Sequence, residues 1–458
     1  MKRNTPAKTA SQQTRRRFLQ LSATTAAAAS ALGFPAILRS ASPNSKLQVA
    51  SIGVGGMGGA TMNNVASHKG VEIVSLCDVE KKTLDRVAVK YPRASKHTDW
   101  RELLSGHTDK FDAVTIGTPD HMHAASAVTA LRAKKHLYLQ KPMASTPHEC
   151  RVIAREAAKA GVVTQLGNQG RSTVESRMAV QLIQSGAIGK IKEVIIWENK
   201  RLSWWPKNTD IRKPADPVPD GFNWDLWQGV REARPWFENT YHPKTWRAWF
   251  DFGVGEMGDM GCHHFDPTFD ALKLTAPMRV RQTTHGSSGP LWSEHRQVEL
   301  VFPGTDVTAG DTVKVTWHDG DLRPDATRIP LPKGVAELNE SGSCWIGEAG
   351  HIYKNYRKGN PVVLPESNFP ADKYPTDIPQ QNHYHDWVDA VIKGRKSCAD
   401  FSHGGPLTET VLVGALSDRF AEKWLKWDSK SLKFTNHKGA TKLVRRAYRD
   451  GWKIPGLG

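Results

Sequence analysis

The chain has 458 residues, a hydrophobic fraction of 39% and a formal net charge of +17, and this length allows two domains with substantial cores. The charge is concentrated at the two ends, because residues 1–46 hold eight Lys or Arg and no acid, and residues 423–458 hold ten Lys or Arg and two acids. The body between them is close to neutral, which argues against an extended phosphate-binding surface and a nucleic-acid partner.

Residues 1–45 have the composition of an export signal. A basic stretch runs to Arg17 and carries the run Thr-Arg-Arg-Arg-Phe-Leu at residues 14–19, and a weakly apolar stretch follows it as far as Leu38. This order is typical of the twin-arginine route, which carries folded proteins. We therefore expect the twin-arginine export machinery as a partner and a periplasmic or envelope-associated location. A basic tail followed by a first helix is the alternative, and an uncleaved anchor stays open.

The cysteines form no Cys-x-x-Cys pair and no even framework of the kind that disulfide-rich proteins show. This pattern fits folding in the reducing cytoplasm before export, with each thiol as a small buried apolar group. The five residues are Cys77, Cys150, Cys262, Cys344 and Cys398.

A dinucleotide-binding fingerprint follows the leader. Residues 46–52 are predicted as a strand, residues 61–68 as a helix and residues 71–77 as a second strand, which Asp78 closes. Glycines between the first strand and the helix permit a tight turn and bring backbone amides close to a pyrophosphate. An acid at Asp78 accepts hydrogen bonds from a ribose diol and repels a 2′-phosphate, so NAD is favoured over NADP. The predicted cofactor contacts here are Gly53, Gly55, Gly56, Met57, Gly58 and Asp78.

Strands and helices continue to alternate as far as residue 168. Strands are predicted at residues 111–116, 136–139 and 162–166, and helices at residues 124–133 and 146–160, the second capped by Thr146. This alternation predicts a parallel sheet, whose ligands bind at the loops after the strand C-termini. Those loops add Thr118, Pro119, His121, His123, Gln140 and Lys141 to the predicted cofactor-binding residues.

Several of these motifs resemble those of the glucose–fructose oxidoreductase, inositol dehydrogenase and rhizopine-catabolism (Gfo/Idh/MocA) family. They are the glycine loop with Asp78, the run Gly-Thr-Pro-Asp-His-Met-His at residues 117–123, and Gln-Lys-Pro at residues 140–142. Residues 258–266 resemble the catalytic helix of the family's second domain. The resemblance extends from about residue 47 to the C-terminus. One departure is Gln140, where the family usually has a glutamate, so the hydrogen bonds are kept and the charge is lost.

The resemblance implies an α/β fold in two domains. The N-terminal Rossmann domain is expected at residues 46–168, and a C-terminal α/β domain with a large, mostly antiparallel open sheet at residues 169–458. It implies Lys141 as the catalytic lysine, His263 as the acid/base, and Asp259 as a group that binds substrate hydroxyls or tunes the other two. Such an open sheet usually pairs with another subunit, so we expect a homo-oligomer.

The chemistry of these residue types agrees with the implied roles. Asp259 and His263 are four residues apart and share one face of a predicted helix. Oxidation of a secondary alcohol needs a base for the hydroxyl proton, which a histidine supplies near neutral pH. A lysine at the same oxygen, here Lys141, stabilises the developing alkoxide charge.

The segment from residue 197 to residue 249 is rich in tryptophan and proline. We predict a long irregular insertion, whose aromatic side chains either stack on sugar rings or fill a core or an interface. The predicted substrate contacts are Arg247, His242 and Trp246, with Lys244 beside them. His264 is grouped with them, although its place on the helix favours packing or support of the site. Half of the sixteen tryptophans lie in the segment, namely Trp197, Trp204, Trp205, Trp224, Trp227, Trp236, Trp246 and Trp249.

A cluster of His383, His385 and Asp386 matches no strong metal-binding spacing. Because Trp387, Val388 and Val391 recur at helical spacing, we predict that the cluster opens a helix. No metal is assigned to this protein.

Two functions stay open on sequence alone. One is an NAD(P)-dependent oxidoreductase acting on a secondary hydroxyl of a carbohydrate or cyclitol, with a tightly held and recycled cofactor. The alternative is an NAD-retaining glycoside hydrolase or lyase that works through transient sugar oxidation. Little free NAD exists outside the cytoplasm, which favours recycling in both cases. The matched set of Lys141, Asp259 and His263 disfavours a non-catalytic sugar-binding protein.

Overall fold

The computed structural model describes residues 46–458, apart from 201–204, 207–210, 212 and 357–358. These described residues belong to one compact unit of the chain. The expected export signal and Trp204 lie outside them. No helix in this part of the chain is both long and apolar enough to cross a membrane.

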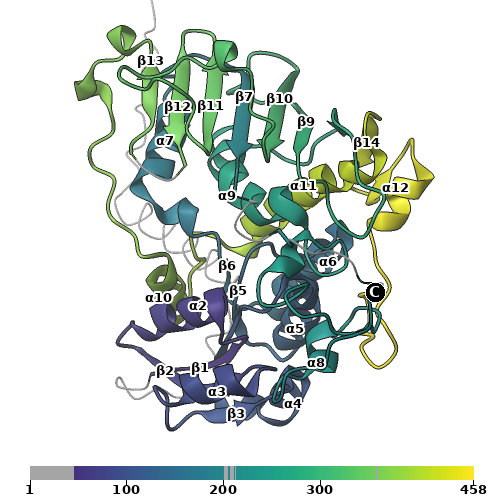
Figure 1. The fold of residues 1–458 in the computed structure, drawn as a ribbon. Helices are drawn as coiled ribbons and strands as arrows, with labels where there is room; N and C mark the ends of the chain where they lie inside the picture. Colours follow the sequence, from purple (N-terminus) through teal and green to yellow (C-terminus); the bar gives the residue numbers. More distant parts are fainter. Residues whose placement is uncertain (1–45, 201–204, 207–210, 212, 357–358) are drawn as a thin grey trace, which may run out of the picture. The chain divides into compact units, whose positions relative to one another are not determined.

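A six-stranded parallel sheet forms the first layer of the fold, as the alternation of strands and helices predicted (Figure 1). β1 lies between β2 and β4, so the chain reverses its direction of travel across the sheet beside the glycine loop, which is where ligands bind in such sheets. In sheet order, the strands are β3 (Ser95–His97), β2 (Val71–Cys77), β1 (Leu47–Ile52), β4 (Ala113–Ile116), β5 (His136–Leu139) and β6 (Thr164–Leu166).

Two helices of this layer, α2 and α5, begin earlier than the sequence predicted. α2 starts at Gly56 rather than Thr61, because Gly55 is its extended N-cap and the loop glycines form the first turn. α5 starts at Asp120, directly after Pro119. The Thr146 hydroxyl caps α6 by accepting the Glu149 N–H, as predicted. The helices are α2 (Gly56–Ala66), α3 (Lys81–Ala88), α4 (Trp100–Gly106), α5 (Asp120–Arg132) and α6 (Pro147–Ala160).

A nine-stranded mixed sheet forms the second layer, and all of its pairs between described strands are antiparallel except β7 with β10. This agrees with the expected large, mostly antiparallel sheet. In sheet order, the strands are β13 (Val362–Leu364), β12 (His351–Asn355), β11 (Gly342–Gly347), β7 (Ile191–Glu198), β10 (Thr312–Asp319), β9 (Arg296–Pro303), β8 (Arg279–Gln282), β14 (Leu425–Asp428) and β15 (Lys433–Phe434).

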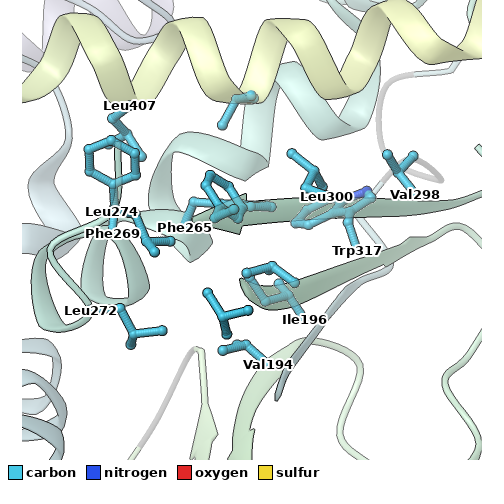
Figure 2. Close-up of a cluster of buried hydrophobic side chains, with 14 of the residues drawn as sticks. Val194, Ile196, Phe265, Phe269, Leu272, Leu274, Val298, Leu300, Trp317 and Leu407 are labelled. Atoms are coloured by element: carbon cyan, nitrogen blue, oxygen red, sulfur yellow. The ribbon is translucent and has the colours of Figure 1, made fainter. Parts of the chain in front are cut away.

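The helix α9 (Gly255–Ala271) covers the middle of this sheet and carries the site residues. Figure 2 shows Phe265 and Phe269 of α9 lying between the strand side chains and Leu407 of α11 (Phe401–Leu416). Val194 and Ile196 of β7 and Trp317 of β10 face the same cluster and are fully buried. Burying this many large apolar groups removes one face of α9 from water and holds its other face toward the first layer. The remaining helices are α7 (Val174–Gln184), α8 (Trp224–Gln228), α10 (His383–Lys393) and α12 (Lys438–Leu443).

The expected boundary between the domains does not separate the two cores. α10 opens with His383 and is capped by the Asn382 side chain, which confirms the predicted helix. Its Trp387, Val388 and Val391, however, pack in the same buried cluster as β1 and β2 of the first sheet. The chain after residue 169 therefore contributes to both layers, because the apolar face of α10 is buried against α2 rather than on the second sheet.

The tryptophan-rich segment is mostly an aromatic core of its own. Trp197 is part of β7 and not of an insertion, so the irregular segment begins after Glu198. Two antiparallel backbone hydrogen bonds, Lys81 N–H to Gly221 and Asn223 N–H to Val79, tie this segment to the loop that follows β2. We call this contact the clamp. The buried aromatic cluster consists of Phe222, Trp224, Trp227, Trp236, Phe237, Tyr241, Trp246, Trp249 and Phe252.

Candidate active site

A cavity of about 550 Å³ runs from the glycine loop to α9. At one end its walls are the glycine loop and Asp78, and at the other end they are side chains of α9 and of the aromatic segment. Its lining brings together these residues predicted from sequence: Gly53, Gly55, Gly56, Met57, Asp78, Thr118, Pro119, Gln140, Lys141, His242, Trp246, Arg247, Asp259 and His263.

The glycine loop leaves no room for side chains at two positions. Gly53 has a φ of +76°, and a Cβ on it would lie 2.8 Å from the backbone carbon of Gly117. A Cβ on Gly58 would lie 2.0 Å from the Gly53 carbonyl oxygen. The loop therefore lies tightly against β4 and directs the N-terminal amides of α2 into the cavity, which is the arrangement that binds a pyrophosphate. The residues present fit a dinucleotide.

Asp78 holds this loop in place. Its Oδ2 accepts hydrogen bonds from the backbone N–H groups of Val54 (2.9 Å) and Gly55 (3.2 Å), and its Oδ1 accepts one from Glu80 (3.0 Å). Burial raises the pKa of Asp78, although these three donors favour the ionised form. The carboxylate thus links the loop to the end of β2 and lies at the edge of the cavity where a ribose would bind.

Lys141 and Asp259 form a buried ion pair at the other end of the cavity. The Lys141 Nζ donates to the Asp259 Oδ1 at 2.8 Å and to the Asp259 backbone oxygen at 2.7 Å. Arg247 also reaches Oδ1 through its Nε at 3.1 Å, and the Lys200 Nζ lies 3.6 Å from Oδ2. Burial would raise the pKa of Asp259, but these cations hold it well below its usual range. The carboxylate is therefore ionised at every working pH.

His263 lies one turn after Asp259 on α9, and both line the cavity, as the four-residue spacing predicted. Its Nδ1 is buried and has no hydrogen-bond partner among the described residues. Burial, followed by the charge of Lys141, lowers its pKa well below the ordinary value. The imidazole is therefore neutral near pH 7, and one ring nitrogen is available to accept a proton.

Gln140 contacts the wall of the cavity rather than Lys141. Its amide Nε2 donates to the Thr61 hydroxyl of α2 at 2.6 Å, and its Oε1 has no partner among the described residues. The side chain packs closely against Gly167, where a Cβ would lie 2.7 Å from Oε1. In place of a charge beside the lysine, Gln140 thus supplies a neutral amide that packs between α2 and Gly167.

Four predicted residues lie outside the lining. Gly58 serves the packing of α2, and His264 is buried with its Nε2 2.9 Å from Glu198, behind the cavity. The ring nitrogens of His121 contact the carbonyl oxygens of Trp227 and Phe252, and those of His123 contact Pro142 and Thr118. Burial lowers the pKa of His121 to about 3 and that of His123 to about 4, so both rings are neutral. Their contacts with backbone carbonyl oxygens hold the loops around the cavity in place.

Sequence reasoning missed Asp120 among the polar residues of the lining. Asp120 is fully buried in the first turn of α5, and burial raises its pKa to about 8. Its position directly after Thr118 and Pro119 was the available signal. Lys200 follows β7 and reaches Asp259 across the cavity. This contact forms because β7 lies beside α9 in the folded protein. Trp227 also lines the cavity, and most other tryptophans of the segment form the aromatic core.

Two family models match the chain. One, the GFO_IDH_MocA oxidoreductase family with an NAD-binding Rossmann fold, matches residues 47–168. The other, the C-terminal alpha/beta domain of the same oxidoreductase family, matches residues 172–308. Together they cover more than half of the chain. Residues 47–168 are thus an NAD-binding Rossmann domain, in agreement with the glycine loop and the N-terminal amides of α2 that face the cavity.

The curated relatives match a shorter part. A glycosyl hydrolase family 109 protein of Shewanella baltica is 29% identical over 176 residues, which are 36% of this chain and 37% of that protein. An alpha-N-acetylgalactosaminidase of Shewanella oneidensis is 30% identical over 32% of this chain and 33% of its own length. A 4-carboxy-2-hydroxymuconate-6-semialdehyde dehydrogenase of Sphingobium is 30% identical over 27% of this chain and 39% of its own. The chain thus spans little more than a third of these relatives.

Solved structures share the whole fold. A levoglucosan dehydrogenase in complex with NADH and L-sorbose has a TM-score of 0.60 at 18% identity, covering 84% of this chain and 100% of its own. The WlbA dehydrogenase of Bordetella pertussis, in complex with NADH and UDP-GlcNAcA, has a TM-score of 0.59 at 15% identity, covering 84% of this chain and 99% of its own. At these identities the likeness is one of fold.

Proposed function

Because the chain belongs to the Gfo/Idh/MocA family of NAD-binding oxidoreductases, we propose that it is an NAD-dependent enzyme that oxidises a secondary hydroxyl of a carbohydrate or cyclitol. One observation carries this proposal. The Lys141–Asp259 pair and His263 lie in the same cavity as the glycine loop and Asp78. A substrate hydroxyl beside Lys141 is therefore within reach of the end of the cavity where a nicotinamide would lie.

The residues divide the work as follows. The neutral His263 accepts the hydroxyl proton through a ring nitrogen. The Lys141 ammonium donates a hydrogen bond to the same oxygen and stabilises the negative charge that develops on it. Asp259 anchors Lys141 through two contacts and remains ionised, so the ammonium is held in place rather than free to swing. NAD, when bound at the glycine loop, supplies a hydride acceptor.

We also propose that the cofactor is retained between turnovers and that the enzyme works outside the cytoplasm. The clamp supports retention, because Lys81 N–H donates to Gly221 and Asn223 N–H donates to Val79 next to the ribose-side carboxylate Asp78. We expect this backbone pairing to slow the release of a dinucleotide. The twin-arginine run at residues 14–19 supports export of the loaded protein.

A second candidate function is glycoside cleavage with retained NAD. The similarity to a glycosyl hydrolase family 109 protein and an alpha-N-acetylgalactosaminidase favours it. The same residues would serve, because transient oxidation of a ring hydroxyl needs the same base and the same lysine. Retention of the cofactor is then required by the chemistry.

One experiment separates the two candidates. The purified protein is assayed for bound nucleotide after acid release, and then incubated with free sugars and with aryl glycosides. Net NADH formation supports the oxidoreductase, whereas glycoside cleavage with no net NADH supports the second function. A protein without affinity for NAD would rule out both.

A further inference from the structure

The substrate end of the cavity is unusually rich in positive charge. Four cations belong to the described lining there, namely Lys141, Lys200, Lys244 and Arg247, and they come from three different parts of the chain. The carboxylates on the same side are Asp120 and Asp259. Buried charge is stable only when an opposite charge compensates it. The difference between positive and negative groups in the cavity therefore indicates the charge of its ligand.

Asp259 does not balance the cations. Its carboxylate is shared by Lys141 at 2.8 Å, Arg247 at 3.1 Å and Lys200 at 3.6 Å. Among the described residues, Asp259 is thus the shared partner of Lys141 and Arg247, and Lys244 adds an exposed positive charge to the lining. The other carboxylates of the described lining, Asp78 and Glu80, belong to the loop that follows β2, at the glycine-loop end of the cavity.

Asp120 does not balance them either. It is 2% exposed, and its Oδ2 has no hydrogen-bond partner among the described residues. Burial raises its pKa to about 8, the charge of Arg247 opposes this rise and that of Asp259 adds to it. The carboxyl is therefore mostly protonated at pH 7 and contributes a neutral hydrogen-bonding group.

Arg247 is held ready for an anion. Its guanidinium lies 4.2 Å from the centre of the Trp246 ring, its Nε is bonded to Asp259, and its Nη1 donates to the Lys244 backbone oxygen at 3.3 Å. Within the described part of the chain, its Nη2 donates to no protein acceptor. A stacked guanidinium with an open edge binds a planar carboxylate with little loss of side-chain entropy.

We infer that the substrate of this site is a sugar acid, whose carboxylate binds to Arg247 and Lys244 while a ring hydroxyl lies beside Lys141 and His263. The inference rests on the proposed function and specifies its substrate class. A carboxylate lowers the excess of positive charge at this end of the cavity, which a neutral sugar leaves unchanged. Arg247 provides recognition of the acid, whereas Lys141 provides the contact with the reacting oxygen.

The test uses matched pairs of sugars that differ only in the acid group. Methyl glucuronide with methyl glucoside, methyl galacturonide with methyl galactoside, and methyl mannuronide with methyl mannoside are titrated into the full-length enzyme with NADH. Tryptophan fluorescence gives Kd, and turnover with NAD gives kcat/KM. We expect at least one acid to bind about tenfold or more tightly than its neutral partner, an advantage that shrinks as salt is raised.

Variants then assign the preference to the named side chains. R247K keeps the charge and removes the planar fork, and K244M removes an exposed charge whose loss leaves the fold intact. Each should weaken the acid at least about threefold more than its neutral partner. R328M, which removes an arginine paired with Glu193 outside the lining, is the matched control and should change neither sugar.

The two proposals fail in different ways. If the enzyme oxidises or cleaves neutral sugars and prefers none of the acids, the sugar-acid inference is wrong and the proposed function stands. If R247K and K244M weaken the sugar acid and its neutral counterpart equally, the two side chains do not recognise the carboxylate. The inference is then overturned as well. Failure to bind NADH would overturn the proposed function itself.

Discussion

The two ends of the active-site cavity are formed by different kinds of chemical groups. The cofactor end is made of backbone: glycines in close contact with β4, the amides at the start of α2, and Asp78, whose carboxylate binds three N–H groups. The substrate end is made of ionisable side chains from separate elements, gathered around Asp259. Ligand binding at the cofactor end is thus sensitive to added side-chain volume, and function at the substrate end is sensitive to changes in side-chain charge.

This difference says how each end recognises its ligand. A backbone cradle fits the pyrophosphate that dinucleotides share, and no side-chain charge has to be tuned for it. A ring of cations around one carboxylate depends on the protonation of every member, so a single substitution changes the field of the whole site. We therefore expect single charge changes to act on catalysis and single volume changes to act on cofactor binding.

The largest effect is expected for K141M at the charged end. Removal of the ammonium leaves the developing alkoxide without its donor, and kcat should fall by about three orders of magnitude or more. NADH affinity should change little, since the glycine loop is not touched, whereas loss of the buried ion pair with Asp259 should lower the melting temperature. Turnover within tenfold of the wild type would show that Lys141 is not the group at the reacting oxygen. K159M, on α6, is the control.

The next effect is expected for G58V at the backbone end. A Cβ at this position overlaps the Gly53 carbonyl oxygen at 2.0 Å. The loop must shift, and NADH affinity should fall by about a hundredfold or more while the protein remains folded or is destabilised by roughly 2–4 kcal/mol. Fluorescence titration and urea unfolding measure both. G56A, whose position has open space but a positive φ, should be milder. Equal losses in the two variants would contradict the packing argument.

A smaller effect is expected for D78A, because Asp78 is a charged side chain within the backbone-built cofactor end. NAD affinity should weaken about tenfold, because the ribose loses an acceptor and the loop loses its tie to β2. Discrimination against NADP should relax, because the charge that repels a 2′-phosphate is gone. Parallel titrations with NADH and NADPH measure the ratio. An unchanged ratio would mean that Asp78 only supports the loop.

The last expected effect is on stability rather than on activity, in the pH dependence of unfolding for D120N. The pKa of Asp120 is about 8 in the folded protein and near 4 when unfolded, so folding takes up a proton between these values. The wild type should then lose stability relative to D120N as pH rises from about 5 to 8, by roughly 1 kcal/mol per pH unit. Urea unfolding at several pH values measures this difference. A constant difference would show that Asp120 is ionised when folded.

Much of the cofactor end could be predicted because its signals are local. The strand, the glycine loop, α2, β2 and Asp78 are consecutive in the chain, so their spacing alone defines the cradle. The pairing of Asp259 with His263 on one helix face is equally local. The predicted helix starts were late, because propensity rules place glycine outside helices, whereas the loop geometry makes Gly56 the first residue of α2.

The substrate end was predicted in part only. Lys141, Asp259 and His263 came from the family resemblance, and Asp120 was missed. The protonation of Asp120 depends on burial by segments far away in the chain, and the contact of Lys200 with Asp259 depends on β7 lying beside α9. No spacing rule carries such information. His264 was placed among the substrate contacts, but its side chain turns to Glu198.

The sequence by itself determined the backbone cradle and the parallel first sheet, because these follow from contacts between near neighbours in the chain, and the family resemblance supplied the second sheet and the helix that carries Asp259 and His263. Only the tertiary structure decided the charge state of the site and the packing of α10 into the first core. Lys141 and Asp259 are 118 residues apart, and burial sets which carboxyl keeps its proton. Such long-range contacts are made by the whole fold, since desolvation depends on everything that surrounds a group.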